Sequence, residues 1–184
     1  MSPMEDVRSL FKQDRLLAVI DSLGSTSKTD IDPELSYILG DCLRQVGRRS
    51  DAKDYLLEAI DRGTPESRFN AAMSLSFLLK DLGQFNQAGQ LLDSLIPNCG
   101  SMPGWFWVIR SAVAAQLEQF DLAIELLDRA EKSMDVDLDE VYFNKATIYR
   151  AIGDRSQSER FAEMALEIGS DFASKAEELK TTLH

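Results

Sequence analysis

The sequence predicts an all-α protein in which helix–turn–helix units are stacked one after another. Two segments with helical hydrophobic spacing meet at Leu82-Gly83-Gln84-Phe85, and the second segment opens with the small residue Ala88. Related turns occur at Gly47, Glu118 and Gly153, so that successive turns are separated by 36, 35 and 35 residues. A nearly constant period of this length is typical of stacked two-helix repeats.

Length and composition indicate a folded protein that is not embedded in a membrane. The chain has 184 residues, of which 44% are hydrophobic and 28% are charged. Its net charge of -11 repels a phosphate backbone, and no block rich in lysine or arginine offsets this, so nucleic acid is not an expected partner. The apolar run from Trp105 to Ile109 is too short to span a bilayer. Two widely separated cysteines and the lack of a secretory leader favour a reducing, cytoplasmic location.

Residues 1–32 are expected to form two short helices followed by a loop. Pro3 suits a helix start and Gly24 a helix end. The segment that follows is rich in serine, threonine and aspartate, whose side chains compete with helical hydrogen bonds. Because Val19 to Leu23 resembles Leu91 to Leu95, the pair is interpreted either as a degenerate first repeat or as an N-terminal cap.

Four complete units are predicted within residues 33–168. Their first helices end near the turns described above, and their return helices bury small residues at the start. The first helix of the second unit is apolar almost all round, as expected for a helix enclosed in a stack. The units span about 33–66, 69–100, 104–135 and 139–168.

Residues 169–184 are predicted to form a C-terminal capping helix. Phe172, Ala176, Leu179 and Leu183 lie on one apolar stripe, opposite charged residues. A stack needs such a helix because its last repeat would otherwise expose an apolar face. The sequence is therefore predicted to form one domain overall.

The four units resemble tetratricopeptide repeats. The small residue that follows a leucine in that family's first helix is matched by Gly40 and Ser76, and the turn glycine is lost only at Glu118. Small residues open all four return helices, and the family's aromatic position is filled by Trp107 and Tyr142 in two units. The closing proline is displaced or absent. The resemblance covers residues 33–168 and implies a right-handed superhelical stack of helix–turn–helix repeats.

The sequence lacks the residue sets typical of an enzyme, a metal site or a cofactor site. The one histidine, His184, ends the chain, and neither a Gly-rich phosphate loop nor an HExxH motif occurs. The segment from Asp135 to Glu140 resembles part of a calcium loop but lacks its sixth-position glycine, and Ala146 replaces its final glutamate. Cys42 lies on an apolar helix face and Cys99 has no neighbouring cation, so neither is a candidate nucleophile.

The resemblance implies a partner-binding groove lined by the first helices. Its chaperone-binding members hold a terminal carboxylate with a lysine, asparagine and arginine clamp, which is missing here because the equivalent positions include Tyr37 and Asp41. The expected partner is therefore a protein or peptide with a hydrophobic or amphipathic segment. The candidate groove residues are Tyr37, Asp41, Arg44, Asn70, Met73, Phe77, Lys80, Trp105, Val108, Ala112, Phe143, Asn144, Thr147 and Arg150.

Two functions follow from these observations. The first is a non-catalytic adaptor or scaffold that binds a peptide in the groove. The alternative is a self-assembling scaffold, a homo-oligomer without a dedicated peptide ligand. Two structural alternatives also remain open: Trp105 and Trp107 belong to the core or serve as binding anchors, and the terminal helix leaves the groove open or fills it.

Overall fold

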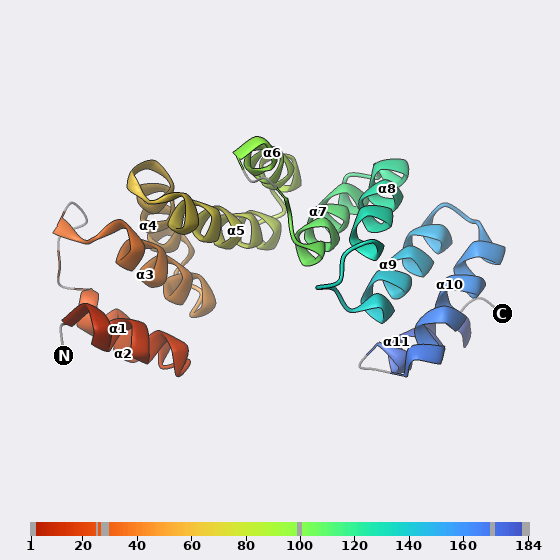
Figure 1. Cartoon of the computed structure of the whole chain (residues 1–184), viewed down its shortest axis with the longest axis horizontal. Helices are drawn as coiled ribbons and strands as arrows, with labels where there is room; N and C mark the ends of the chain where they lie inside the picture. The colour runs from red at the N-terminus through yellow and green to blue at the C-terminus, as the bar shows by residue number, and fades with distance from the viewer. Residues whose placement is uncertain (1–2, 25, 27–29, 99–100, 170–171, 182–184) are drawn as a thin grey trace. The chain divides into compact units, whose positions relative to one another are not determined.

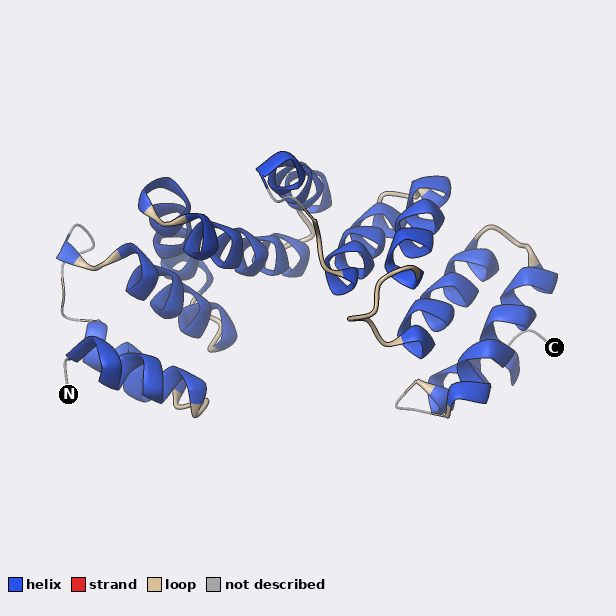
Figure 2. Cartoon of the chain, viewed as in Figure 1, coloured by secondary structure: helices blue, strands red, loops and turns tan. Residues whose placement is uncertain are grey.

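A computed structural model describes residues 3–24, 26, 30–98, 101–169 and 172–181. Figure 2 shows helices joined by short loops, with no strand in these ranges. The chain divides into two compact units, Met1–Leu95 and Ile96–His184, which we call unit 1 and unit 2. This boundary falls in the connection between the second and third predicted repeats, and the single-domain organisation stays a prediction.

The described residues of unit 1 form three helical hairpins (Figure 1). Each hairpin consists of a first helix and a return helix that contact each other, and the first helices also contact the next first helix in the unit. The helices are α1 (Pro3–Lys12) and α2 (Leu16–Leu23), α3 (Pro33–Gln45) and α4 (Arg49–Arg62), and α5 (Pro65–Asp81) and α6 (Phe85–Leu95).

In unit 2, the residues that the structure describes form two hairpins followed by a single helix (Figure 1). The final helix contacts both helices of the preceding hairpin, so it takes the position that a first helix takes elsewhere. The elements are η2 (Ile96–Asn98), α7 (Gly104–Gln116), α8 (Phe120–Glu131), α9 (Leu138–Ala151), α10 (Arg155–Ile168) and α11 (Ala173–Thr181).

Within the described ranges, all five hairpins share one turn geometry. One residue of each turn has a positive φ: Asp14 (56°), Gly47 (81°), Gly83 (70°), Glu118 (57°) and Gly153 (82°). The next residue donates its N–H to a carbonyl five positions earlier, as in the 2.8 Å bond from Gln84 to Leu79. The bond from Arg15 to Leu10, at 3.0 Å, is of the same kind. The α1–α2 pair is therefore built like the repeats, which favours a degenerate repeat over a cap.

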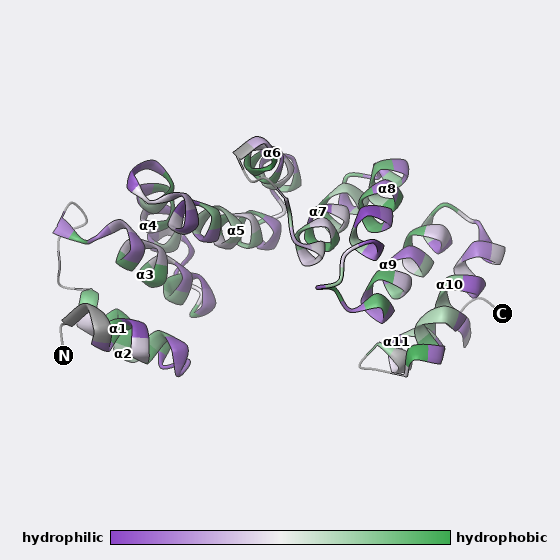
Figure 3. Ribbon diagram, in the orientation of Figure 1, coloured by the Kyte–Doolittle hydropathy of each residue, from purple (hydrophilic) through white to green (hydrophobic). Residues whose placement is uncertain are grey.

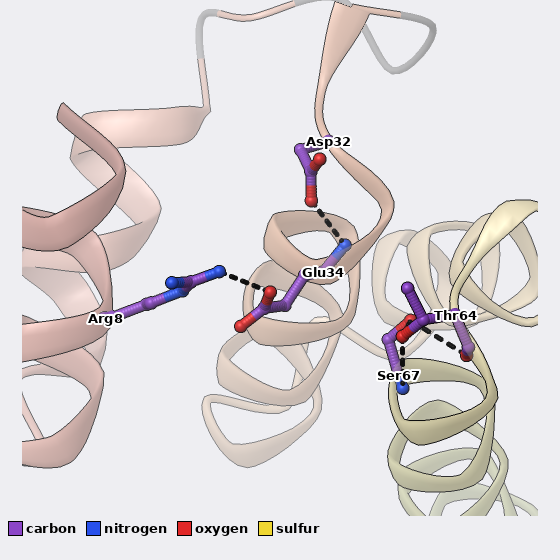
Figure 4. Close-up of polar contacts among 5 residues, drawn as sticks. All are labelled: Arg8, Asp32, Glu34, Thr64 and Ser67. Atoms are coloured by element: carbon purple, nitrogen blue, oxygen red, sulfur yellow. Dashed lines mark hydrogen bonds and ion pairs between the residues drawn. The ribbon is translucent and has the colours of Figure 1, made fainter. Parts of the chain in front are cut away.

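Helix starts follow from local side-chain chemistry. Asp32 accepts a hydrogen bond from the N–H of Glu34, Thr64 accepts one from Ser67, and a proline follows each of these two capping residues. These contacts place the first turns of α3 and α5 (Figure 4). They matter for function because both turns border the pocket described below.

Small residues allow the two helices of a hairpin to approach closely. Ala52, Ala88, Ala123 and Ser158 are fully buried, as the sequence predicts. A Cβ atom added at Gly40 would lie 2.8 Å from Leu56 Cγ, which leaves no room for a side chain there. Most helices carry apolar and polar residues together, green and purple in Figure 3, as expected for helices with one buried face.

The final helix of unit 2 caps its last hairpin as predicted. Ala176 and Leu179 of α11 are buried against Ala146, Ala162 and Ala165. Leu183 and the terminal His184 lie outside the described residues. No helix in the described part of the chain is long and apolar enough to cross a membrane.

Candidate functional site

A pocket in unit 1 lies on the first helices α1, α3 and α5. It has a volume of about 550 Å³, and a smaller compartment of about 70 Å³ shares its lining residues Glu34, Tyr37 and Asn70. We call the larger space the unit 1 pocket. Its lining consists of Arg8, Phe11, Lys12, Glu34, Tyr37, Ile38 and Asn70, and the smaller compartment adds Thr64, Glu66 and Ser67.

Two contacts hold α1 against α3 at the unit 1 pocket. Arg8 Nη2 donates to Glu34 Oε2 across the pocket (Figure 4). The rings of Phe11 and Tyr37 meet edge to face, with centroids 6.1 Å apart and an interplanar angle of 80°. Burial, with a smaller contribution from the charge of Asp41, raises the pKa of Tyr37 to about 12. The Tyr37 hydroxyl is therefore protonated at neutral pH.

A second polar cluster lies further along α3 and α5. Asp41 accepts hydrogen bonds from Arg44 Nε at 3.0 Å and from Gln45 Nε2 at 2.8 Å. The Arg44 guanidinium and the Lys80 ammonium each lie 5.6 Å from the centroid of the Phe77 ring. Phe77 is half-buried, so its ring is held by cations while part of it stays accessible.

A pocket in unit 2 lies between α9 and α11 and has a volume of about 330 Å³. The Phe143 and Phe172 rings are 5.6 Å apart, and Lys175 Nζ lies 4.7 Å from the Phe172 centroid. Helix α11 thus forms one wall of this pocket. The lining residues are Phe143, Asn144, Thr147 and Arg150 from α9, and Lys175, Glu178 and Leu179 from α11.

The predicted groove residues differ in how much surface they offer. Met73 and Val108 are each 5% exposed, and Val108 belongs to the apolar core of unit 2, so neither presents a large contact surface in this structure. Asp41 is 7% exposed, whereas Trp105 is 40% exposed. Arg150 is exposed, and the half-buried residues are Tyr37, Arg44, Asn70, Phe77, Lys80, Ala112, Phe143, Asn144 and Thr147.

Six of the predicted groove residues line the two pockets. At least three of the lining residues of each pocket were not predicted. Tyr37 and Asn70 lie in unit 1, and the unit 2 pocket includes the four predicted residues of α9. The sequence reasoning missed Arg8, Phe11 and Lys12 because α1 lies in the segment whose repeat character was left open. Asp14 lies 33 residues before Gly47, close to the repeat period, but an aspartate does not by itself indicate a turn.

Several side chains that were weighed as metal ligands or nucleophiles make contacts within the fold instead. Asp135 Oδ1 accepts a 2.9 Å hydrogen bond from Gly104 N and so fixes the start of α7. Burial and the nearby charge of Asp41 raise the pKa of Cys42 to about 12, which keeps its thiol protonated. No cluster of three or more metal-ligating side chains occurs within the ranges given above. Cys99 and His184 fall outside those ranges.

Solved structures share this fold at low sequence identity. One is a tetratricopeptide repeat protein from Parabacteroides merdae, with a TM-score of 0.80 and 16% sequence identity. The match covers 98% of this chain and 70% of that protein's chain. The match to a MamA structure labelled AMB-1 covers 92% of this chain and 100% of that chain, with a TM-score of 0.78 and 16% identity. The match to a MamA structure labelled MSR-1 covers 99% of this chain and 97% of that chain, with a TM-score of 0.72 and 17% identity.

These matches define the class of fold. No protein-family model matches the sequence, and no curated protein shows significant sequence similarity to it. The chain has the all-α helical-repeat architecture of tetratricopeptide repeat proteins. The predicted resemblance and fold class are confirmed.

Proposed function

We propose that the protein is a non-catalytic adaptor that binds a peptide or an amphipathic protein segment on the first helices of its hairpins. The observation that carries this proposal is the position of the pockets. In both units they are lined by first helices, or by α11 in an equivalent position, and they combine aromatic with polar and charged side chains. Such mixed concave surfaces are suited to side-chain anchors.

The half-buried aromatic residues indicate how the partner is held. Phe77 in unit 1 and Phe143 in unit 2 are partly accessible and have cationic or aromatic neighbours. Large aromatic side chains contribute disproportionately to protein interfaces. The proposal therefore assigns them as anchors for apolar side chains of the partner and places the protein in the cytoplasm, without nucleic acid, cofactor or metal.

The test uses a partner captured with the purified chain and identified by mass spectrometry. Replacing Phe77 or Phe143 with serine should weaken that partner more than tenfold in calorimetric titration, since an anchor contributes about 2 kcal/mol or more. The melting temperature should fall much less than in Leu92→Ala, because Leu92 is fully buried.

Two results contradict the proposal. If both serine variants bind the partner normally, Phe77 and Phe143 are not its anchors and the proposed binding on these first helices fails. If light scattering shows a homo-oligomer that the Phe77 variant dissociates, the chain is the self-assembling scaffold of the alternative hypothesis.

A further inference from the structure

We propose that the unit 1 pocket receives an aromatic side chain with a neighbouring carboxylate, both from the interior of a partner's chain. This inference rests on the proposed function and adds the chemistry of the segment recognised. It assigns the degenerate first hairpin a binding role, because α1 supplies Arg8, Phe11 and Lys12.

The pocket has the size and walls for one aromatic ring. Its volume of about 550 Å³ lies within the range of about 300–1,000 Å³ typical of ligand pockets. Phe11 and Tyr37, already in edge-to-face contact, present further ring surface, and Ile38 adds an apolar wall. A third ring can pack against the first two in the offset or perpendicular geometry that aromatic groups favour.

The charges of the pocket differ from those of the whole protein. The chain carries a net charge of -11, yet α1 places Arg8 and Lys12 at this pocket. The carboxylate of Glu34 is paired with Arg8. Lys12 is exposed and makes no ion pair with any residue that the structure describes. A carboxylate of the partner is the group that complements Lys12.

Two further donor groups belong to residues that line the pocket, Arg8 and Tyr37. Arg8 Nε is buried and has no hydrogen-bond partner in the described part of the chain, whereas Arg8 Nη2 is used by Glu34. The Tyr37 hydroxyl remains protonated and can donate a hydrogen bond. The carboxylate of Glu66 lies at the smaller compartment, so the anionic group of the partner belongs at the α1 side.

The count of cations favours a side-chain carboxylate within the chain over a chain terminus. An acidic C-terminal residue brings two negative charges, its side chain and its α-carboxylate. One of the two pocket cations is already paired with Glu34. A single internal aspartate or glutamate next to an aromatic residue matches the remaining charge.

The experiment measures fluorescence anisotropy of three labelled peptides, each acetylated and amidated so that it has no terminal charge. The first has a tryptophan next to one aspartate, the second has a lysine in place of the aspartate, and the third has alanine in place of the tryptophan. The first should bind at least tenfold more tightly than the other two. Its affinity should fall with added salt, because exposed charges are screened.

A charge reversal at an exposed position tests the site itself. Lys12→Glu should weaken the first peptide at least tenfold, whereas Lys53→Glu, the same change on the return helix α4, should leave its affinity within twofold. Phe11→Ala should also weaken it, with the melting temperature measured to exclude unfolding. Because Lys12 is exposed, its variant tests the proposal even if Phe11→Ala unfolds.

Equal binding of the lysine peptide, or equal effects at Lys12 and Lys53, would overturn the inference. The adaptor proposal survives that result if the captured partner still binds and still depends on Phe77 or Phe143. If those residues also prove irrelevant, both proposals fail.

Discussion

Two ionic contacts between neighbouring hairpins, one in each unit, differ in their burial. In unit 2, Lys145 of α9 is 3% exposed, and its Nζ lies 2.6 Å from Asp128 Oδ1 and 2.5 Å from Glu131 Oε2, both on α8. In unit 1, the Arg8–Glu34 pair joins α1 to α3 with both side chains more than 40% exposed. The contact of Lys145 joins two neighbouring hairpins through a buried nitrogen. The Arg8–Glu34 contact borders the unit 1 pocket. The two contacts therefore differ in burial, and this difference predicts different contributions to stability.

The largest expected effects test whether the apolar cores of the units are equivalent. Leu56 in unit 1 and Leu127 in unit 2 are both fully buried. Replacing either with alanine leaves a cavity and should lower the free energy of unfolding by about 2–5 kcal/mol. Chemical denaturation of both variants measures this. A cost below about 1 kcal/mol in one unit alone would show that the cores differ as well as the charges.

The second prediction compares the ionic contacts directly. Lys145→Met removes charge-assisted hydrogen bonds from a buried nitrogen and should cost about 2 kcal/mol. Arg8→Met removes a half-exposed pair and should cost less than about 1 kcal/mol. Denaturation curves of the two variants give the difference in their free energies of unfolding. Equal losses would contradict the expected difference between the buried and the half-exposed contact.

The pH dependence sharpens the same prediction. Burial alone lowers the pKa of Lys145, but its hydrogen bonds to Asp128 and Glu131 outweigh this and raise the pKa above its ordinary value of 10.5. A raised pKa of a basic group means that its contribution is complete below pH 10.5 and is lost as the pH rises through the folded-state pKa. The stability difference between the parent and Lys145→Met should therefore stay constant from about pH 7 to 9 and shrink above pH 10.5.

The smallest expected effects concern one turn from each unit. Gly83→Ala places a Cβ atom on a residue with φ of 70° and should destabilise the protein by about 1 kcal/mol. Glu118→Gly relieves the same strain at φ of 57° and should stabilise it by a few tenths to about 1 kcal/mol. Thermal melting should therefore shift in opposite directions. A shift of the same sign would mean that the Glu118 side chain contributes to stability.

Much of the fold could be predicted because its local rules are visible in the sequence. Positive φ at Gly47, Gly83 and Gly153 favours glycine, and Ala88 or Ala123 marks a close helix crossing. The turn at Glu118 was still recognised, since its neighbours kept the period. The first hairpin could not be assigned because Asp14 hides the same backbone geometry behind an ordinary acidic residue.

The site was less predictable because groove membership depends on the neighbouring helix. Tyr37 was expected to line a groove, but its partner across the pocket is Phe11, from a segment without a recognisable repeat signature. The burial of Met73 depends on packing that periodicity does not reveal. Lys175 and Glu178 lie on the polar side of a predicted cap, and the sequence left open whether that helix fills the groove; its role as one wall of a pocket depends on its packing against α9.

The positive φ shared by these turns determines whether an L-residue or a D-residue is favoured there. A Cβ atom of L configuration at Gly47, Gly83 or Gly153 would meet no atom within 4 Å, so the obstacle there is backbone conformation and not lack of space. A D-amino acid favours the positive φ that an L-residue resists. D-alanine, introduced at these exposed glycines by chemical ligation, would restrict the unfolded chain while leaving the native backbone unchanged. At each of these three glycines, a D-residue therefore fits the native backbone better than any L-residue that the genetic code encodes.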